Sequence, residues 1–183
     1  MGWEAGFVNL AAFSARLSRN ERGVATIELS LMVGFLSLAM LNTVEIAKFY
    51  FQKMEVENAT QMGAQAAWKT CDTTKLPATT NCSGLTTAIT TAISSTSLGN
   101  AVTLQTGFPQ EGYYCLNTSN TLVYASNVSS KPANCSATGQ ATLQPGDYIK
   151  IQTQYSYSPI FPGFTIGSLL PTSITSTSMM RLQ

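Results

Sequence analysis

One apolar segment near the N-terminus restricts what this chain can fold into. Residues 24–44 form a run of 21 residues in which Glu28 is the only charged side chain. A helix rises about 1.5 Å per residue, so this run can span the roughly 30 Å hydrocarbon core of a bilayer. We therefore predict a single transmembrane helix over residues 24–44. A carboxylate inside such a segment is costly, and its presence calls for a functional reason.

The charges on either side of the segment predict its orientation. Arg16, Arg19 and Arg22 precede it, whereas the first lysine after it is Lys48. Positive residues are retained on the cytoplasmic side of a membrane. We expect a cytoplasmic N-terminus, a single membrane pass, and export of the rest of the chain.

A cleaved secretory signal peptide is the alternative interpretation of the same segment. Ser37, Leu38 and Ala39 make a weak small-x-small cleavage site. The apolar run is longer than the usual 7–15 residues of a signal peptide, and the helical pattern continues past Ala39 without a turn residue. These two features favour a retained anchor.

The four cysteines all follow the apolar segment, at Cys71, Cys82, Cys115 and Cys135. An even number on the exported side predicts two disulfides formed in an oxidising compartment. We favour the pairs Cys71–Cys82 and Cys115–Cys135, because short loops cost the least entropy to close. Zinc is the competing interpretation, but its paired ligands are usually two to four residues apart.

The composition argues against several function classes. Charged residues make up 10% of the chain, against about 25% in typical proteins, and the net charge is +1. No basic stripe indicates nucleic-acid binding, and the absence of histidine removes the commonest general base and metal ligand. The exported part contains no paired carboxylates, phosphate loop or nucleophile elbow, and Asp147 and Lys150 look isolated. We predict a protein that is not an enzyme and that has no cofactor or metal.

Helical periodicity continues beyond the membrane segment as far as Trp68, with apolar or small residues at Val56, Ala59, Met62, Gly63, Ala66 and Ala67. Half of one long helix would thus lie in lipid and half in the exported domain. The stretch 71–84 contains turn residues and predicts a loop. A short amphipathic helix follows over residues 85–93, with Ser83 as its expected N-cap.

A β pattern begins near residue 100. Alternation or β-rich composition predicts strands at residues 102–104, 112–115, 121–124 and 148–157, with an edge strand at 173–180. Three prolines and two glycines predict a loop or a partial helix at 159–171. In the longest strand, five side chains would share the packed face: Ile149, Ile151, Thr153, Tyr155 and Tyr157.

The expected fold class is α+β, with a long N-terminal transmembrane helix packed on a small antiparallel sheet. Four segments result: a cytoplasmic leader (1–23), the transmembrane half of the helix (24–44), its exported half (45–69), and an exported α+β domain (70–183).

The start of the helix carries a resemblance to a known family. Arg22 and Gly23 are followed by small residues, Glu28 and the apolar run, and then by Glu45, Lys48 and Tyr50 and by the alanine-rich stretch Ala64, Ala66 and Ala67. Over residues 19–68 this arrangement resembles the TadE-type pseudopilins of the tight-adherence type IV pilus system.

The resemblance implies a processing and assembly function. A prepilin peptidase would cleave after Gly23, so that Val24 becomes the new N-terminus and Glu28 its fifth residue. In pilin-like assemblies this glutamate faces the terminal amine of a neighbouring subunit, and pairing offsets much of the cost of two buried charges. The resemblance further implies the bacterial inner membrane, a periplasmic C-terminal domain, and partners among sibling pseudopilins and the pilus assembly platform.

Two other classes of function stay open from the sequence. A single-pass, membrane-anchored binding module would need no cleavage at Gly23. A membrane-tethered hydrolase would need an acid, a base and a nucleophile close together in the β region.

Overall fold

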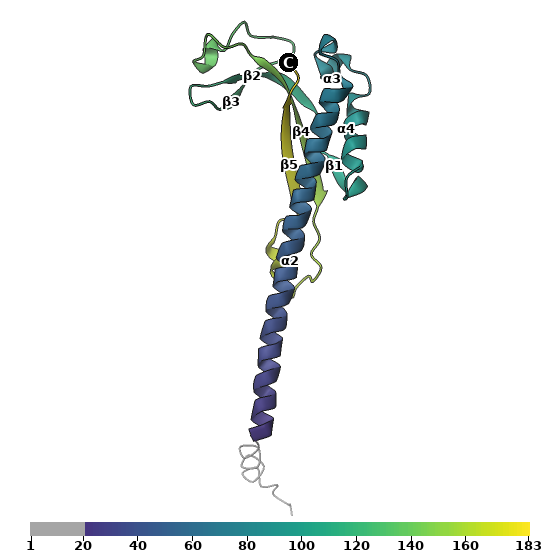
Figure 1. The fold of residues 1–183 in the computed structure, drawn as a ribbon, viewed down its shortest axis with the longest axis vertical. Helices are drawn as coiled ribbons and strands as arrows, with labels where there is room; N and C mark the ends of the chain where they lie inside the picture. Colours follow the sequence, from purple (N-terminus) through teal and green to yellow (C-terminus); the bar gives the residue numbers. More distant parts are fainter. Residues whose placement is uncertain (1–20) are drawn as a thin grey trace, which may run out of the picture.

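The computed structural model describes residues 21–183, so nearly all of the predicted leader lies outside the described residues. One long helix, α2 (Glu21–Thr70), runs the length of the molecule (Figure 1). A small antiparallel sheet and a second helix pack along its upper half, whereas its lower half projects alone. The predicted α+β fold with a long N-terminal helix is confirmed.

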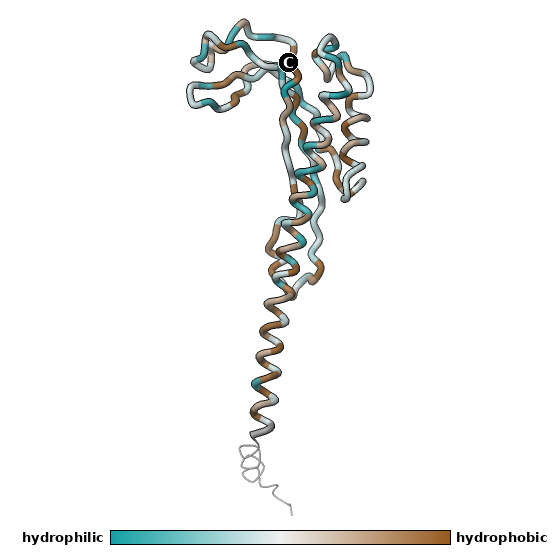
Figure 2. Tube along the Cα trace, viewed as in Figure 1, coloured by the Kyte–Doolittle hydropathy of each residue, from teal (hydrophilic) through white to brown (hydrophobic). Residues whose placement is uncertain are grey.

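The two halves of α2 differ in what surrounds them. Its upper half buries Val56, Ala59, Ala64 and Ala67 completely. Its lower half is mostly coloured brown, for hydrophobic residues, in Figure 2, and every described residue from 23 to 40 is exposed. The small side chains of the upper half let neighbouring elements approach: a Cβ placed on Gly63 would lie 3.1 Å from the Ile93 side chain.

Ile93 belongs to the second amphipathic helix, α4 (Leu85–Ser94), which lies against α2 and buries Leu85, Ile89 and Ile93. This helix was predicted, but Ser83 as its N-cap was wrong. Gly84 is the N-cap, in a left-handed conformation with φ 85°, and its carbonyl accepts the first helical hydrogen bond, from the Ala88 amide. Glycine adopts this conformation without the steric penalty that a side chain would bring.

The sheet has five antiparallel strands: β1 (Val102–Leu104), β2 (Gln110–Leu116), β3 (Leu122–Asn127), β4 (Gly146–Ser156) and β5 (Ser173–Arg181). The central strand is β4. It pairs with β5 along one edge, and β1 and β2 share its other edge, with β3 beyond β2. All five predicted strands are present, and β5 is an edge strand as expected.

The packed face of β4 is the one that the alternation predicted. Ile149, Ile151 and Thr153 are fully buried, and the Thr153 hydroxyl lies 2.6 Å from the hydroxyl of Thr60 on α2. The Gln52 amide donates to the Tyr155 hydroxyl at 2.8 Å. Two polar contacts thus align the helix with the strand along an otherwise apolar interface.

Both predicted disulfides are present. Cys71–Cys82 joins the end of α2 to the segment that precedes α4, across the short helices η1 (Thr73–Lys75) and α3 (Ala78–Asn81). Cys115–Cys135 ties β2 to the loop that carries η3 (Ser136–Thr138). The remaining 3-10 helices are η2 (Gly99–Ala101) and η4 (Ile166–Leu169). The segment 159–171, predicted as a loop or a partial helix, is a loop that contains η4.

Candidate functional site

The lower half of α2 is a long apolar surface that no other element of the described chain covers. Ten large apolar side chains between residues 24 and 40 are about half exposed or more: Val24, Ile27, Leu29, Leu31, Met32, Val33, Phe35, Leu36, Leu38 and Met40. The helix is long and apolar enough to cross a membrane. Soluble proteins seldom expose apolar surface of this extent, so lipid or protein must cover it.

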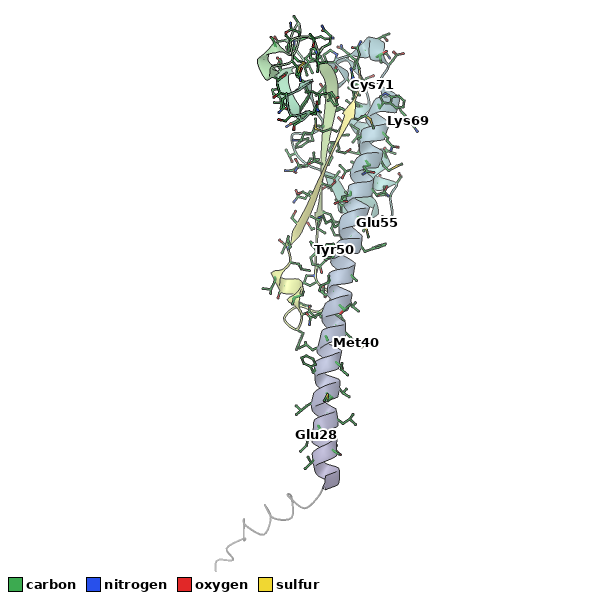
Figure 3. All side chains as sticks on the ribbon, turned by 60° about the vertical axis from the view of Figure 1, so that its left-hand side comes forward. Glu28, Met40, Tyr50, Glu55, Lys69 and Cys71 are labelled. Atoms are coloured by element: carbon green, nitrogen blue, oxygen red, sulfur yellow. A yellow bond between two sulfur atoms is a disulfide. The ribbon has the colours of Figure 1, made fainter. Side chains whose placement is uncertain are left out.

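Glu28 stands on this bare half of the helix, near its lower end (Figure 3). Its side chain is exposed, and no hydrogen bond or salt bridge joins it to another described residue. Leu31 and Phe35 follow it about one and two turns further along the same face. The carboxylate is therefore free to meet a group from outside the chain.

Three uncharged polar side chains of the bare half donate hydrogen bonds to the preceding turn of the helix. The Ser30 hydroxyl donates to the Thr26 carbonyl at 2.6 Å, and the Thr43 hydroxyl donates to the Ala39 carbonyl at 2.9 Å. The Asn42 amide donates to the Leu38 carbonyl at 2.7 Å. Such bonds to the preceding turn let polar residues sit in an apolar environment without unpaired donors.

A buried carboxylate marks the point where the helix meets the domain. Glu45 is 0% exposed. It accepts a hydrogen bond from the Tyr157 hydroxyl and further bonds from the backbone amides of Ile160, at 3.1 Å, and Phe161, at 3.3 Å. One side chain of α2 thus holds three donors from the segment that follows β4.

The hydrogen bonds to Glu45 determine which of the two side chains, Glu45 or Tyr157, carries a charge. Burial raises the pKa of Glu45, but the hydrogen bonds from Tyr157, Ile160 and Phe161, together with nearby Lys48, outweigh it and leave the pKa below the ordinary 4.5. Burial and the Glu45 charge raise the pKa of Tyr157 to about 12. Glu45 is therefore ionised and Tyr157 neutral at pH 7. Because the folded pKa of Glu45 is lowered, its stabilising effect is present above about pH 4.5 and is lost in stronger acid.

Further contacts close this site, which we call the helix–loop clamp (Glu45, Lys48, Tyr157 and the amides of Ile160 and Phe161). The Lys48 ammonium donates to the Ser158 carbonyl at 2.8 Å and lies 5.5 Å from the centre of the Tyr157 ring. A Cβ on Gly167 would lie 2.7 Å from the Glu45 side chain, so only glycine fits there without a shift. The clamp ties α2 to the segment that follows β4.

Sequence reasoning noted Glu45, Lys48 and Tyr50 as part of a family pattern but gave them no structural role. The structure separates them: Glu45 and Lys48 form the clamp, whereas Tyr50 faces outward and is exposed. A signal for the burial of Glu45 was available. Glu45, Phe49, Gln52 and Val56 are spaced by four, three and four residues, which places Glu45 on the helix face that packs on the domain.

A pair of carboxylates lies at the end of the sheet opposite the clamp. Asp147 looked isolated in the sequence, but the structure shows it 3% exposed and close to Glu111, which lies on the neighbouring strand β2. Glu111 accepts bonds from the Ala78 and Thr79 amides, both at 2.7 Å, at the start of α3. Burial, and next the Glu111 charge, raise the pKa of Asp147 to about 6.

Replacing Asp147 with asparagine is expected to stabilise the domain at neutral pH. Between pH 3.8 and about 6 the folded state binds more protons at this site than the unfolded state, so stability falls as the pH rises through that range. Asp147→Asn should flatten this slope and raise the free energy of unfolding at pH 7 by roughly 1–3 kcal/mol. Urea unfolding of both proteins at pH 4 and pH 7 measures the effect, and an unchanged slope would contradict it.

Among residues 21–183, no three side chains of Cys, Asp or Glu gather closely enough to hold a metal ion. Comparisons of the chain with protein-family models, with curated proteins and with solved structures gave no match.

Proposed function

We propose that this chain is a pilin-like structural subunit of the TadE type, which takes part in assembly of a tight-adherence pilus. The observation that carries the proposal is a single unbroken helix, α2, with two different halves. Its lower half exposes a mostly apolar surface with one carboxylate, Glu28, and its upper half is fixed to a disulfide-bonded domain.

The lower half of such a helix can contact lipid first and the helices of other subunits later. In the inner membrane the lower half would contact lipid, with the domain of residues 45–183 in the periplasm. After extraction it would pack against the helices of sibling subunits, where Ser30, Gly34 and Ser37 allow close approach. The clamp at Glu45 supports this function, because a pull on either half of the helix is transmitted to the other half and to the domain.

The first turn of α2, which contains Gly23, supplies the processing step of the proposal. A prepilin peptidase would cleave after Gly23 and release an amine on Val24. Glu28 would pair with the amine of a neighbouring subunit, and the stagger between the two subunits would follow from that pairing. The proposed partners are the peptidase, sibling pseudopilins and the assembly platform.

Replacing Gly23 with alanine is expected to block processing. A Cβ at Gly23 meets no atom within 4 Å, so the substitution leaves the described structure unchanged and acts only on recognition by the peptidase. N-terminal sequencing of the protein from its native membrane measures the result. The wild type should begin at Val24, and Gly23→Ala should retain its leader.

A matched control is available eleven residues further along. Gly34 is equally free of neighbours within 4 Å, so Gly34→Ala should be processed normally. An intact Met1 in the wild type would favour the anchored binding module instead. A wild-type protein that begins near Met40 would indicate a secreted protein and overturn the filament proposal.

A further inference from the structure

The loop between β4 and β5 exposes several large apolar side chains. We call residues 158–170 the junction loop. Phe164 is 78% exposed and Leu169 is 83% exposed, with Ile160 and Ile166 also on the surface. No charged residue occurs anywhere from residue 151 to residue 180. A surface loop in water would usually carry polar side chains at such positions, so a non-aqueous contact is expected.

The clamp, together with Asn42, sets the position of this loop along the axis of α2. The backbone amide of Ile166 donates to the Asn42 side chain at 2.8 Å, and the amides of Ile160 and Phe161 donate to Glu45. Asn42 lies inside the apolar run that ends at residue 44. In Figure 1 the segment with η4 lies beside α2 at the lower end of the domain. The junction loop is therefore level with the last turn of the apolar run.

We propose that the junction loop is a second membrane contact, which inserts Phe164 and Leu169 at the boundary between headgroups and acyl chains of the periplasmic leaflet. The inference rests on the proposed function, in that it assumes a stage at which residues 24–44 span the membrane. Its ligand is the acyl region of a bilayer. Amphipathic segments bind this region through apolar side chains buried about 5–10 Å deep.

Continuity with the bare half of α2 favours lipid over a protein partner. The loop is bonded to α2 at Asn42 and Glu45, beside the end of the apolar run at residue 44, so one bilayer surface at that level would meet both the run and the loop. Directly above this level the helix presents Lys53, Tyr50 and Phe51 to solvent. Lysine and aromatic residues are the usual anchors in the headgroup region.

A docked loop would set the orientation of the exported domain. A single helix leaves a domain free to rotate about the helix axis. Because the clamp makes the loop rigid with α2, insertion of one side of the domain would fix its rotation and tilt relative to the membrane. The subunit would then present one defined face to an incoming partner.

Depth-dependent fluorescence quenching tests the proposal on the full-length chain in phosphatidylcholine and phosphatidylglycerol vesicles. Trp3 and Trp68 are first replaced with phenylalanine. A single tryptophan is then introduced by Phe164→Trp in the loop, by Phe35→Trp in the apolar helix, or by Tyr124→Trp on β3. The native side chains at positions 164, 35 and 124 are all exposed, so introducing tryptophan there should preserve the fold. Lipids brominated near the headgroup or deep in the acyl chain serve as quenchers.

We expect tryptophan at position 164 to lose emission mainly with the shallow bromines, and tryptophan at position 35 mainly with the deep ones. Tryptophan at position 124 should lose none. Quenching at position 35 without quenching at position 164 overturns the loop proposal and leaves the anchored helix intact. Absence of quenching at both positions overturns the anchor as well. An unquenched position 164 whose emission shifts to shorter wavelength only at high protein density would show a second copy over the loop, and would also overturn the lipid contact.

Discussion

Replacing Glu28 with alanine is expected to abolish pilus assembly while leaving cleavage after Gly23 intact. The structure leaves the Glu28 carboxylate without a partner among the described residues, so its proposed partner is the amine of Val24 on a neighbouring subunit. An amine buried among apolar helices without its carboxylate would cost about 3–5 kcal/mol per contact. That loss recurs at every subunit of a filament, so even the lower value of this range should prevent the filament from growing.

Two readouts separate assembly from processing. Pili sheared from cells and counted by electron microscopy report assembly, and N-terminal sequencing of the membrane pool reports cleavage. Glu57→Ala is a matched control, because Glu57 is an exposed carboxylate on the upper half of the same helix. It should leave both readouts unchanged. Normal pili from Glu28→Ala would contradict the pairing function.

Glu28→Gln distinguishes charge from shape. Glutamine keeps the size of the side chain and can accept a hydrogen bond, but it cannot neutralise an amine. If pairing of charges sets the stagger, Glu28→Gln should assemble as poorly as Glu28→Ala. Near-normal assembly of Glu28→Gln would indicate that a hydrogen bond is sufficient.

The sequence predicted those parts of the fold that depend on local periodicity. Val56, Ala59, Gly63 and Ala67 of the predicted stripe are buried, whereas Met62 of the same stripe is 39% exposed. The alternation around Ile151 predicted the buried face of β4. Both patterns arise because one face of each element meets the core. The disulfide pairing was also predictable, because closing the two shortest loops costs the least entropy.

Contacts between distant parts of the chain could not be predicted in the same way. Glu45 and Tyr157 are separated by 112 residues, and nothing local to either indicates that they meet. Asp147 looked isolated because the strand pairing that brings Glu111 close is itself a long-range feature. The N-cap of α4 was missed for a different reason: glycine and serine are adjacent there, and backbone conformation selected the glycine.

Replacing Glu45 with alanine is expected to destabilise the exported domain strongly. The substitution leaves the Tyr157 hydroxyl and the amides of Ile160 and Phe161 without their acceptor. Each buried unpaired donor costs about 1–3 kcal/mol, and bonds to a charged acceptor lie toward the upper end. We expect the free energy of unfolding to fall by roughly 3–5 kcal/mol. Urea unfolding of the full-length protein in detergent micelles measures the change.

The loss of stability should increase with the number of hydrogen bonds that a substitution removes. It should also begin in the junction loop. Tyr157→Phe removes one of the three donors and should cost about 1–2 kcal/mol, whereas Glu57→Gln on the exposed helix face should stay within about 0.5 kcal/mol. Chymotrypsin should cut Glu45→Ala first at Phe161 or Phe164, because release of the clamp frees the loop before the sheet unfolds. Equal stability of Glu45→Ala and Glu57→Gln would show that the clamp does not hold the helix to the domain. Loss of stability without earlier cleavage in the loop would mean that Glu45 supports the core as a whole and not the junction.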